Sequence, residues 1–134
     1  MKKTTVALLT VVFIVLCFGC YTPDLDRPSL TRYVTLKVFG DSTNVTINGE
    51  EDIDLTASPY ESRVKLVAEK QGDDPFFEEW VFPSVALTVE DFSGGYTLVN
   101  AEIWDEKTGQ IEASGIITEP FEAITIAYKP DLRP

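Results

Sequence analysis

The chain of 134 residues contains no histidine and only two cysteines, Cys17 and Cys20. A Ser-His-Asp triad, a cysteine activated by histidine and a zinc site with histidine ligands are therefore excluded. Cations are also scarce, because 11 Lys and Arg stand against 22 Asp and Glu, which gives a net charge of −11. Binding to phosphate requires clustered positive charge, so this composition argues against nucleic acid and anionic headgroups as direct partners.

The chain also lacks a long apolar run. Its main apolar run, residues 6–18, has 13 residues and is interrupted only by Thr10, whereas a membrane-spanning helix needs roughly 20 apolar residues. The run follows Lys2 and Lys3, an arrangement typical of the apolar region of a secretory signal peptide. We therefore expect the protein to be exported.

The apolar run ends in Cys17-Phe18-Gly19-Cys20, which resembles the lipobox of bacterial lipoproteins, usually Leu-x-Gly/Ala-Cys. The resemblance implies that residues 1–19 are a signal peptide, that cleavage occurs before Cys20, and that the Cys20 thiol is lipidated. Cys17 departs from the pattern, since leucine is usual three residues before the lipidated cysteine. A plain signal peptide cut near Gly19 and an uncleaved N-terminal anchor are the alternatives.

Lipidation at Cys20 determines the expected location. Two or three acyl chains hold a soluble domain on a membrane effectively permanently. The mature chain would keep one alkylated cysteine, so neither a disulfide nor a Cys-x-x-Cys redox pair is expected. We expect a lipoprotein of the cell envelope. By the sorting rule of enteric bacteria, Tyr21 after the cysteine predicts the outer membrane, if the host has one.

Between its two ends the chain has the pattern of a single all-β domain. Residues 20–31 are interpreted as the lipidated cysteine and an extended tether, and residues 130–134 as a flexible C-terminal end. Residues 32–129 show polar and apolar alternation and no useful helical stripe. Alternating strands are expected at 32–39, 63–68, 84–89 and 124–128, and largely buried strands at 96–104 and 110–118.

Turn residues at regular spacing predict about seven or eight strands in a small immunoglobulin-like antiparallel β-sandwich, with a small β-barrel as the alternative. Gly109 is expected to take a positive φ in the hairpin at residues 105–109. At Asn48-Gly49, a two-residue loop would place the apolar residues of its two strands on different faces. We therefore expect a three-residue loop with a bulge at Gly49, which places Val45 and Ile53 on one face.

The strand pattern is similar to that of small lipoproteins with an MmpS-like domain. The similar segments are YVTLKVFG, NVTINGEEDIDL, LVNAEIWDEKTGQIEASG and EAITIAY, within residues 33–128. The resemblance implies an immunoglobulin-like sandwich without catalysis and, as in mycobacterial members, an accessory role beside a lipid-exporting transporter. This chain lacks the family's cysteine pair, and EKQGDDPFFEEWVF differs from its proline-tryptophan segment. Those members are held by a transmembrane helix rather than by a lipid.

Aromatic side chains cluster in the segment 72–83, as Phe76, Phe77, Trp80 and Phe82. One interpretation is an exposed patch that contacts a partner, a glycan or a lipid. The other, which we favour, is that Trp80 and Phe82 cap the core while Phe76 and Phe77 fold back over it, because a small domain needs its large side chains inside.

Two acidic clusters, residues 50–54 and 73–79, could hold calcium or could be solvated strand edges. A hydrolase would need two carboxylates in a cleft, which one small sandwich rarely offers. We therefore expect a non-catalytic, lipid-anchored envelope module that binds a protein partner, with no cofactor and no metal. The alternative is a carbohydrate- or calcium-dependent ligand-binding module that uses residues 72–83.

Overall fold

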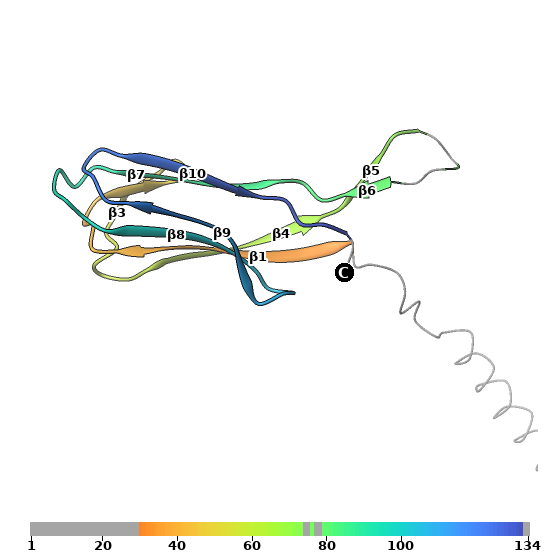
Figure 1. Ribbon diagram of the computed structural model, residues 1–134, viewed down its shortest axis with the longest axis horizontal. Coiled ribbons are helices and arrows are strands. Elements are labelled where there is room, and N and C mark those ends of the chain that lie inside the picture. The colour runs from red at the N-terminus through yellow and green to blue at the C-terminus, as the bar shows by residue number, and fades with distance from the viewer. Residues whose placement is uncertain (1–29, 74–75, 77–78, 133–134) are drawn as a thin grey trace, which may run out of the picture.

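A computed structural model describes residues 30–73, 76 and 79–132, so the expected signal peptide, Cys20 and most of the expected tether lie outside the described residues. The described chain folds into antiparallel β-strands (Figure 1). Within it, no helix is long and apolar enough to cross a membrane. The strands are β1 (Thr31–Gly40), β2 (Val45–Ile47), β3 (Glu50–Ile53), β4 (Tyr60–Val67), β5 (Glu69–Gln71), β6 (Glu79–Val81), β7 (Val85–Asp91), β8 (Val99–Asp105), β9 (Gln110–Ile117) and β10 (Ala123–Tyr128).

Eight of these strands form a two-layer sandwich. The first sheet has the order β4-β1-β8-β9 and the second has the order β10-β7-β2-β3. The sheets stay open at their edges, so the predicted β-sandwich is confirmed and the alternative β-barrel does not form. Strands β5 and β6 pair only with each other. They form an arm that projects beyond one end of the sandwich, and the sequence analysis did not anticipate it (Figure 1).

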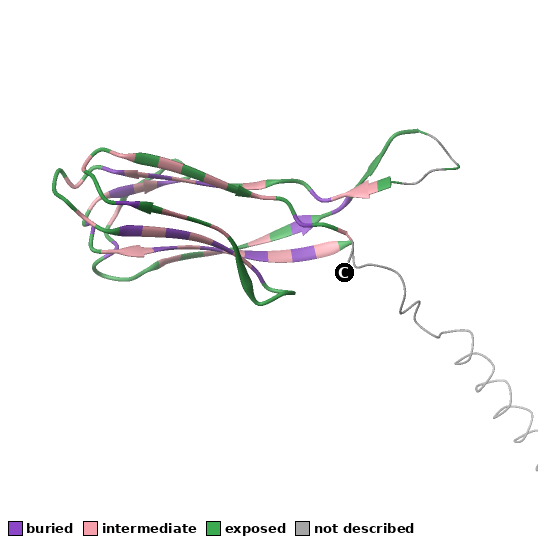
Figure 2. Ribbon diagram, viewed as in Figure 1, coloured by how far each residue is buried: buried purple, intermediate pink, exposed green. Residues whose placement is uncertain are grey.

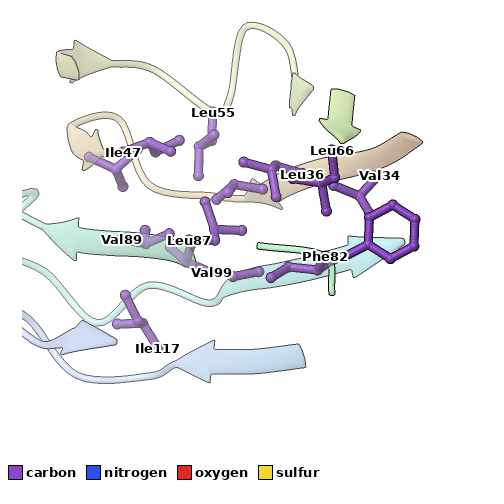
Figure 3. Close-up of a cluster of buried hydrophobic side chains, with 14 of the residues drawn as sticks. Val34, Leu36, Ile47, Leu55, Leu66, Phe82, Leu87, Val89, Val99 and Ile117 are labelled. Carbon is purple, nitrogen blue, oxygen red and sulfur yellow. The ribbon is translucent and has the colours of Figure 1, made fainter. Parts of the chain in front are cut away.

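The core lies between the two sheets. Along β1, polar and apolar residues alternate, so Val34, Leu36 and Val38 point inward while their neighbours face outward (Figure 2). Leu87 and Val89 of β7 meet them from the second sheet, and Figure 3 shows the buried cluster. Each such side chain contributes about 1.5–3 kcal/mol when fully buried.

Two segments were predicted as largely buried strands. The first is confirmed from Val99 onward, because β8 is a central strand of alternating buried and half-buried residues, but residues 96–98 lie in a loop. β9 does form, but most of its residues are exposed because it is an edge strand with a hydrogen-bonded neighbour on one side only. A bulge opposite Ile103 and Trp104 also turns Ile111 outward, where it is exposed. Apolar composition alone did not distinguish an edge strand from a central one.

The hairpin between β2 and β3 shows one error in the predicted turn and one confirmed expectation. Asn48 and Gly49 both have positive φ, at 47° and 84°, and Ile47 pairs with Glu50, so the loop has two residues. The predicted three-residue loop is therefore wrong. The extra residue sits in β3 instead, where Asp52 has a φ of 59°. This bulge brings Val45 opposite Ile53, so the two residues lie on one face as predicted.

A buried polar cluster closes the end of the sandwich where β1 begins, which we call the tether pole. Asp105 is fully buried, and its Oδ2 accepts hydrogen bonds from Arg32 Nη1 at 2.9 Å and from the Tyr128 hydroxyl at 2.7 Å. Burial, together with this hydrogen bond, raises the pKa of Tyr128. The cluster joins β1 and β8 of the first sheet to β10 of the second.

The residues after β10 pack against the same pole. Arg32 Nη2 donates to the Asp131 carbonyl at 2.8 Å, Pro130 is buried, and Leu132 packs against the core. Residues 130–132 of the expected flexible end therefore pack against the sandwich, where the buried Arg32 guanidinium finds a second acceptor. The last two residues lie outside the described part.

Candidate functional site

Four loops gather at the end of the sandwich opposite the tether pole (Figure 1). Backbone hydrogen bonds connect them, including Leu55 N to Ser42 O at 3.0 Å, Asp41 N to Leu98 O at 3.1 Å, Phe92 N to Asn44 O at 2.9 Å and, from the last residue of β7, Asp91 N to Glu122 O at 3.0 Å. The loops therefore form one continuous surface, which we call the loop pole. It consists of residues 41–44, 54–59, 92–98 and 118–122.

Asp91, the last residue of β7, holds two of these loops in place through hydrogen bonds. Its side chain is fully buried and accepts hydrogen bonds from Ser42 Oγ at 2.7 Å, from the Ser93 backbone N–H at 3.0 Å and from the Thr97 hydroxyl. Burial by itself would raise the pKa of Asp91, but these donors outweigh it and the pKa is lowered. The carboxylate thus links β7 to both the 41–44 loop and the 92–98 loop.

Other carboxylates order each loop locally. Asp41 Oδ1 accepts the Leu98 backbone N–H at 2.6 Å. Glu122 Oε2 accepts the backbone N–H groups of Thr118 at 3.2 Å and Glu119 at 3.3 Å. Because the loops are fixed by their own side chains, their conformation exists before any partner arrives.

Large apolar side chains project from these ordered loops. Tyr96 is 87% exposed, Phe121 70%, Leu98 49% and Phe92 45%. A Cβ at Gly94 would lie 3.9 Å from Phe121 Cζ, so the Phe121 ring lies beside the 92–98 loop. Exposed aromatic residues grouped in this way are typical of an interaction surface rather than of solvated loops.

Phe121 is also strained. Its φ is 60°, in the left-handed region that a bulky side chain rarely adopts. Such a conformation costs on the order of 1–3 kcal/mol and persists only where the surrounding structure imposes it. Here the bond between Glu122 O and Asp91 N fixes the chain immediately after Phe121.

The charge on the loop pole has one sign. The four loops contain Asp41, Asp54, Glu119 and Glu122 and no Lys or Arg. The cations of the described residues all lie in β1, β4, the arm, the β8–β9 hairpin and the segment after β10. They are Arg32, Lys37, Arg63, Lys65, Lys70, Lys107 and Lys129.

The residues that the sequence analysis singled out lie elsewhere. Phe82 is 1% exposed and lies at one end of the core cluster (Figure 3), and Trp80 packs partly buried against that core. Phe76 is 88% exposed on the arm, so it does not fold back as we expected. Phe77 and the lipidation candidate Cys20 lie outside the described residues. The structure therefore places Phe82 in the core and Phe76 exposed on the arm, while Trp80 of β6 packs against the core.

The two acidic clusters do not form a metal site in the described part of the chain. There, no group of three or more Asp, Glu or Cys residues is placed to hold a metal ion. Glu50 and Glu51 lie exposed on β3, an edge strand, where charge discourages pairing with other chains. Asp74 and Glu78 of the second cluster are outside the described residues.

A shallow hollow of about 330 Å³ marks the outer face of the first sheet. Trp104 contributes to its lining, and the indole Nε1 donates to Glu102 Oε2 at 2.7 Å. The residues around the hollow are Thr35, Lys37, Glu61, Trp104, Asp105, Glu106 and Gly109.

The charges beside this hollow are paired. Arg63 binds both oxygens of Glu106, at 2.8 and 2.9 Å, and stacks over Tyr33 with its guanidinium carbon 3.9 Å from the ring centre. This pairing lowers the pKa of Glu106 and raises that of Arg63. Lys37 lies 3.7 Å from Glu61. The hollow therefore presents the Trp104 side chain beside charges that are paired.

The loop pole was not predicted, because Tyr96 and Leu98 belong to a segment whose apolar composition predicts a buried strand. A usable signal was present: Ser93-Gly94-Gly95 marks a loop immediately before them, and Pro120 marks another before Phe121. Apolar residues next to such turn residues are candidates for exposed loop positions.

Comparison with known proteins gives no match to this chain among family models, curated proteins or solved structures.

Proposed function

We propose that this protein is a lipid-anchored, non-catalytic module of the bacterial cell envelope that binds a protein partner through its loop pole. One observation supports this most directly. The chain enters the sandwich at Thr31, at the end opposite the loop pole. An anchor at Cys20 therefore attaches the tether pole to the membrane and leaves the aromatic loops facing away from it.

The tether is long enough to give the domain freedom. Residues 20–30 span at most roughly 35–40 Å when extended, at about 3.3–3.6 Å per residue. The domain then searches the space next to the membrane while its loop pole stays accessible. This arrangement suits an accessory subunit of a larger envelope assembly, which is also the role that the MmpS-like resemblance implies.

A binding role also fits the chemistry of the loops. The carboxylates of Asp41, Asp91 and Glu122 are engaged by hydroxyl and backbone N–H groups at the pole. They act as structural acceptors that hold the loops in place. Ordered loops with exposed aromatic residues on a rigid sandwich are a common way to build a recognition surface.

The anchoring part of the proposal is tested by the intact mass of the protein purified from membranes. We expect a mature chain that begins at Cys20 and carries two or three acyl chains. Cys20→Ser should release the protein from the membrane fraction, whereas the matched variant Cys17→Leu, which restores the usual lipobox leucine, should leave lipidation intact. Recovery of wild-type protein without acyl groups would overturn the proposal.

A second candidate function is the binding of a small neutral saccharide in the Trp104 hollow. An accessible indole beside paired, neutralised charges suits the apolar face of an uncharged sugar ring. Here Trp104→Ala should abolish binding to an immobilised neutral glycan, and Tyr96→Ala should not change it. Loss of partner binding in Tyr96→Ala with Trp104→Ala unaffected would favour the first proposal instead.

A further inference from the structure

We infer that the loop pole recognises a positively charged protein segment, with Lys or Arg side chains placed against the exposed aromatic rings. This inference rests on the proposed function and adds the chemical class of the partner. It starts from the combination of exposed aromatic residues and charge of a single sign on one ordered surface.

The charges determine which partners are compatible. Asp41, Asp54, Glu119 and Glu122 give the loop pole four carboxylates without a cation among the loop residues. The Debye length is about 8 Å at physiological salt, so charges on the same pole act together on an approaching surface. Anionic lipid and nucleic acid are repelled, whereas a cationic protein surface is attracted and oriented.

One of these carboxylates is available for a partner. Asp41 and Glu122 accept backbone N–H groups, and Asp54 accepts the Thr56 backbone N–H at 2.9 Å. The exposed Glu119 carboxylate has no hydrogen bond or ion pair with any described residue. It lies in the same loop as Phe121, so an ammonium or guanidinium group that reaches Glu119 also approaches an aromatic ring.

The aromatic residues supply the second half of such a site. A Lys or Arg side chain within about 6 Å of an aromatic ring centre is attracted to the face of the ring, more strongly as water is excluded. Tyr96 and Phe121 are the most exposed of the pole's large side chains. Arg63 over Tyr33 shows that this fold already uses the same pairing of guanidinium, ring and carboxylate within its own first sheet.

The loops are ordered in advance, which lowers the entropic cost of binding. Asp91 holds the 92–98 loop through Ser93 and Thr97, and Glu122 holds the 118–122 loop. The strained φ of Phe121 keeps its ring exposed beside Gly94. Loops that only face solvent would need neither these hydrogen bonds nor the strained backbone at Phe121.

The test is photo-crosslinking from the pole in the intact envelope. The full-length protein, with Tyr96 replaced by p-benzoyl-phenylalanine, is expressed in its host and irradiated, and the crosslinked peptide is identified by mass spectrometry. We expect a protein segment with net positive charge and a Lys or Arg adjacent to the crosslinked residue. A crosslink to lipid, to glycan, or to a neutral or acidic segment would overturn the inference while leaving the lipid anchor intact.

A matched pair of charge variants sharpens the result. Glu119→Lys, combined with the photo-reactive residue at 96, should lower the crosslink yield by at least about threefold. Glu69→Lys makes the same charge change on the exposed arm strand β5 and should leave the yield unchanged. Equal yields from both variants, with unchanged melting temperatures, would overturn the role of charge. No crosslink from position 96 in an acylated, folded protein would overturn both the inference and the loop pole as the binding surface.

Discussion

The Tyr128 hydroxyl donates a 2.7 Å hydrogen bond to the Asp105 carboxylate, and this bond joins the two sheets at the tether pole. Tyr128 belongs to β10 of the second sheet and Asp105 to β8 of the first. The same carboxylate oxygen pairs with Arg32 of β1 at 2.9 Å. Through Asp105, the first strand of the domain is therefore connected to both sheets.

Tyr128→Phe should remove this bond while keeping the ring in place. We expect a loss of about 1 kcal/mol in the free energy of unfolding, because Arg32 and the Lys107 backbone N–H still satisfy Asp105. The raised pKa of Tyr128 makes its contribution fully present below the unfolded tyrosine value of 10.0 and lost as pH rises above it. Urea unfolding at pH 7 and pH 11 should show a smaller alkaline loss in the variant than in the wild type.

Asp91→Asn should have a larger effect at the loop pole. The buried carboxylate accepts from two hydroxyls and one N–H, whereas an amide would turn a donor toward some of them, so we expect a loss of about 2–3 kcal/mol. The lowered pKa of Asp91 means that its stabilisation is present above the unfolded value of 3.8 and is lost as pH falls below it. Melting temperatures between pH 7 and pH 2 should fall less steeply in the variant, and parallel curves would contradict the assignment.

At Gly40, the last residue of β1, the neighbouring backbone leaves no room for a Cβ atom. A Cβ at this position would collide with the Leu98 carbonyl oxygen and lie 2.9 Å from Val99 Cα. Both contacts are backbone atoms of the neighbouring strand region, so they cannot yield as a flexible side chain would. Gly40→Ala should therefore cost about 3 kcal/mol, which lowers the melting temperature by roughly 10–20 °C. Gly95→Ala, in open space without a positive φ, is the control and should change it by less than about 3 °C.

The strands of the sandwich were largely predictable because burial on one face imposes alternation on the sequence. The inward positions of β1, such as Val34 and Leu36, follow that rule directly. Polar and apolar alternation does not indicate whether a strand is central or at the edge of a sheet. The prediction that the segment of β9 is largely buried is therefore wrong. The bulge at Asp52 was also misplaced, since the sequence required a one-residue offset without saying which strand contained it.

The loop pole was not predictable from the sequence, for a different reason. Asp91, Ser42 and Thr97 meet only because the strand order brings the ends of β1, β7 and β8 together. Nothing local to any of the three residues marks it as part of a network. The purely negative charge of the pole was likewise not evident from the sequence, because its four acidic residues are dispersed over three separate loops.

A substitution at Phe121 can distinguish a role of this residue in binding from a role in stability. Asparagine tolerates the left-handed conformation better than phenylalanine, so Phe121→Asn should relieve strain at a φ of 60°. The ring is 70% exposed, so its removal sacrifices little core packing. We therefore expect the free energy of unfolding to stay level or rise by about 1 kcal/mol, as measured by urea denaturation.

The same variant should bind its partner less well, because it loses one of the two most exposed rings of the pole. Crosslinking from position 96 should fall several-fold in Phe121→Asn, whereas Phe76→Asn on the arm should leave it unchanged. A strained residue that is retained for packing would give the opposite result, with stability lost and binding kept. Stability maintained together with binding lost would show that the strain at Phe121 serves recognition, because selection for stability alone would favour asparagine or glycine at that position.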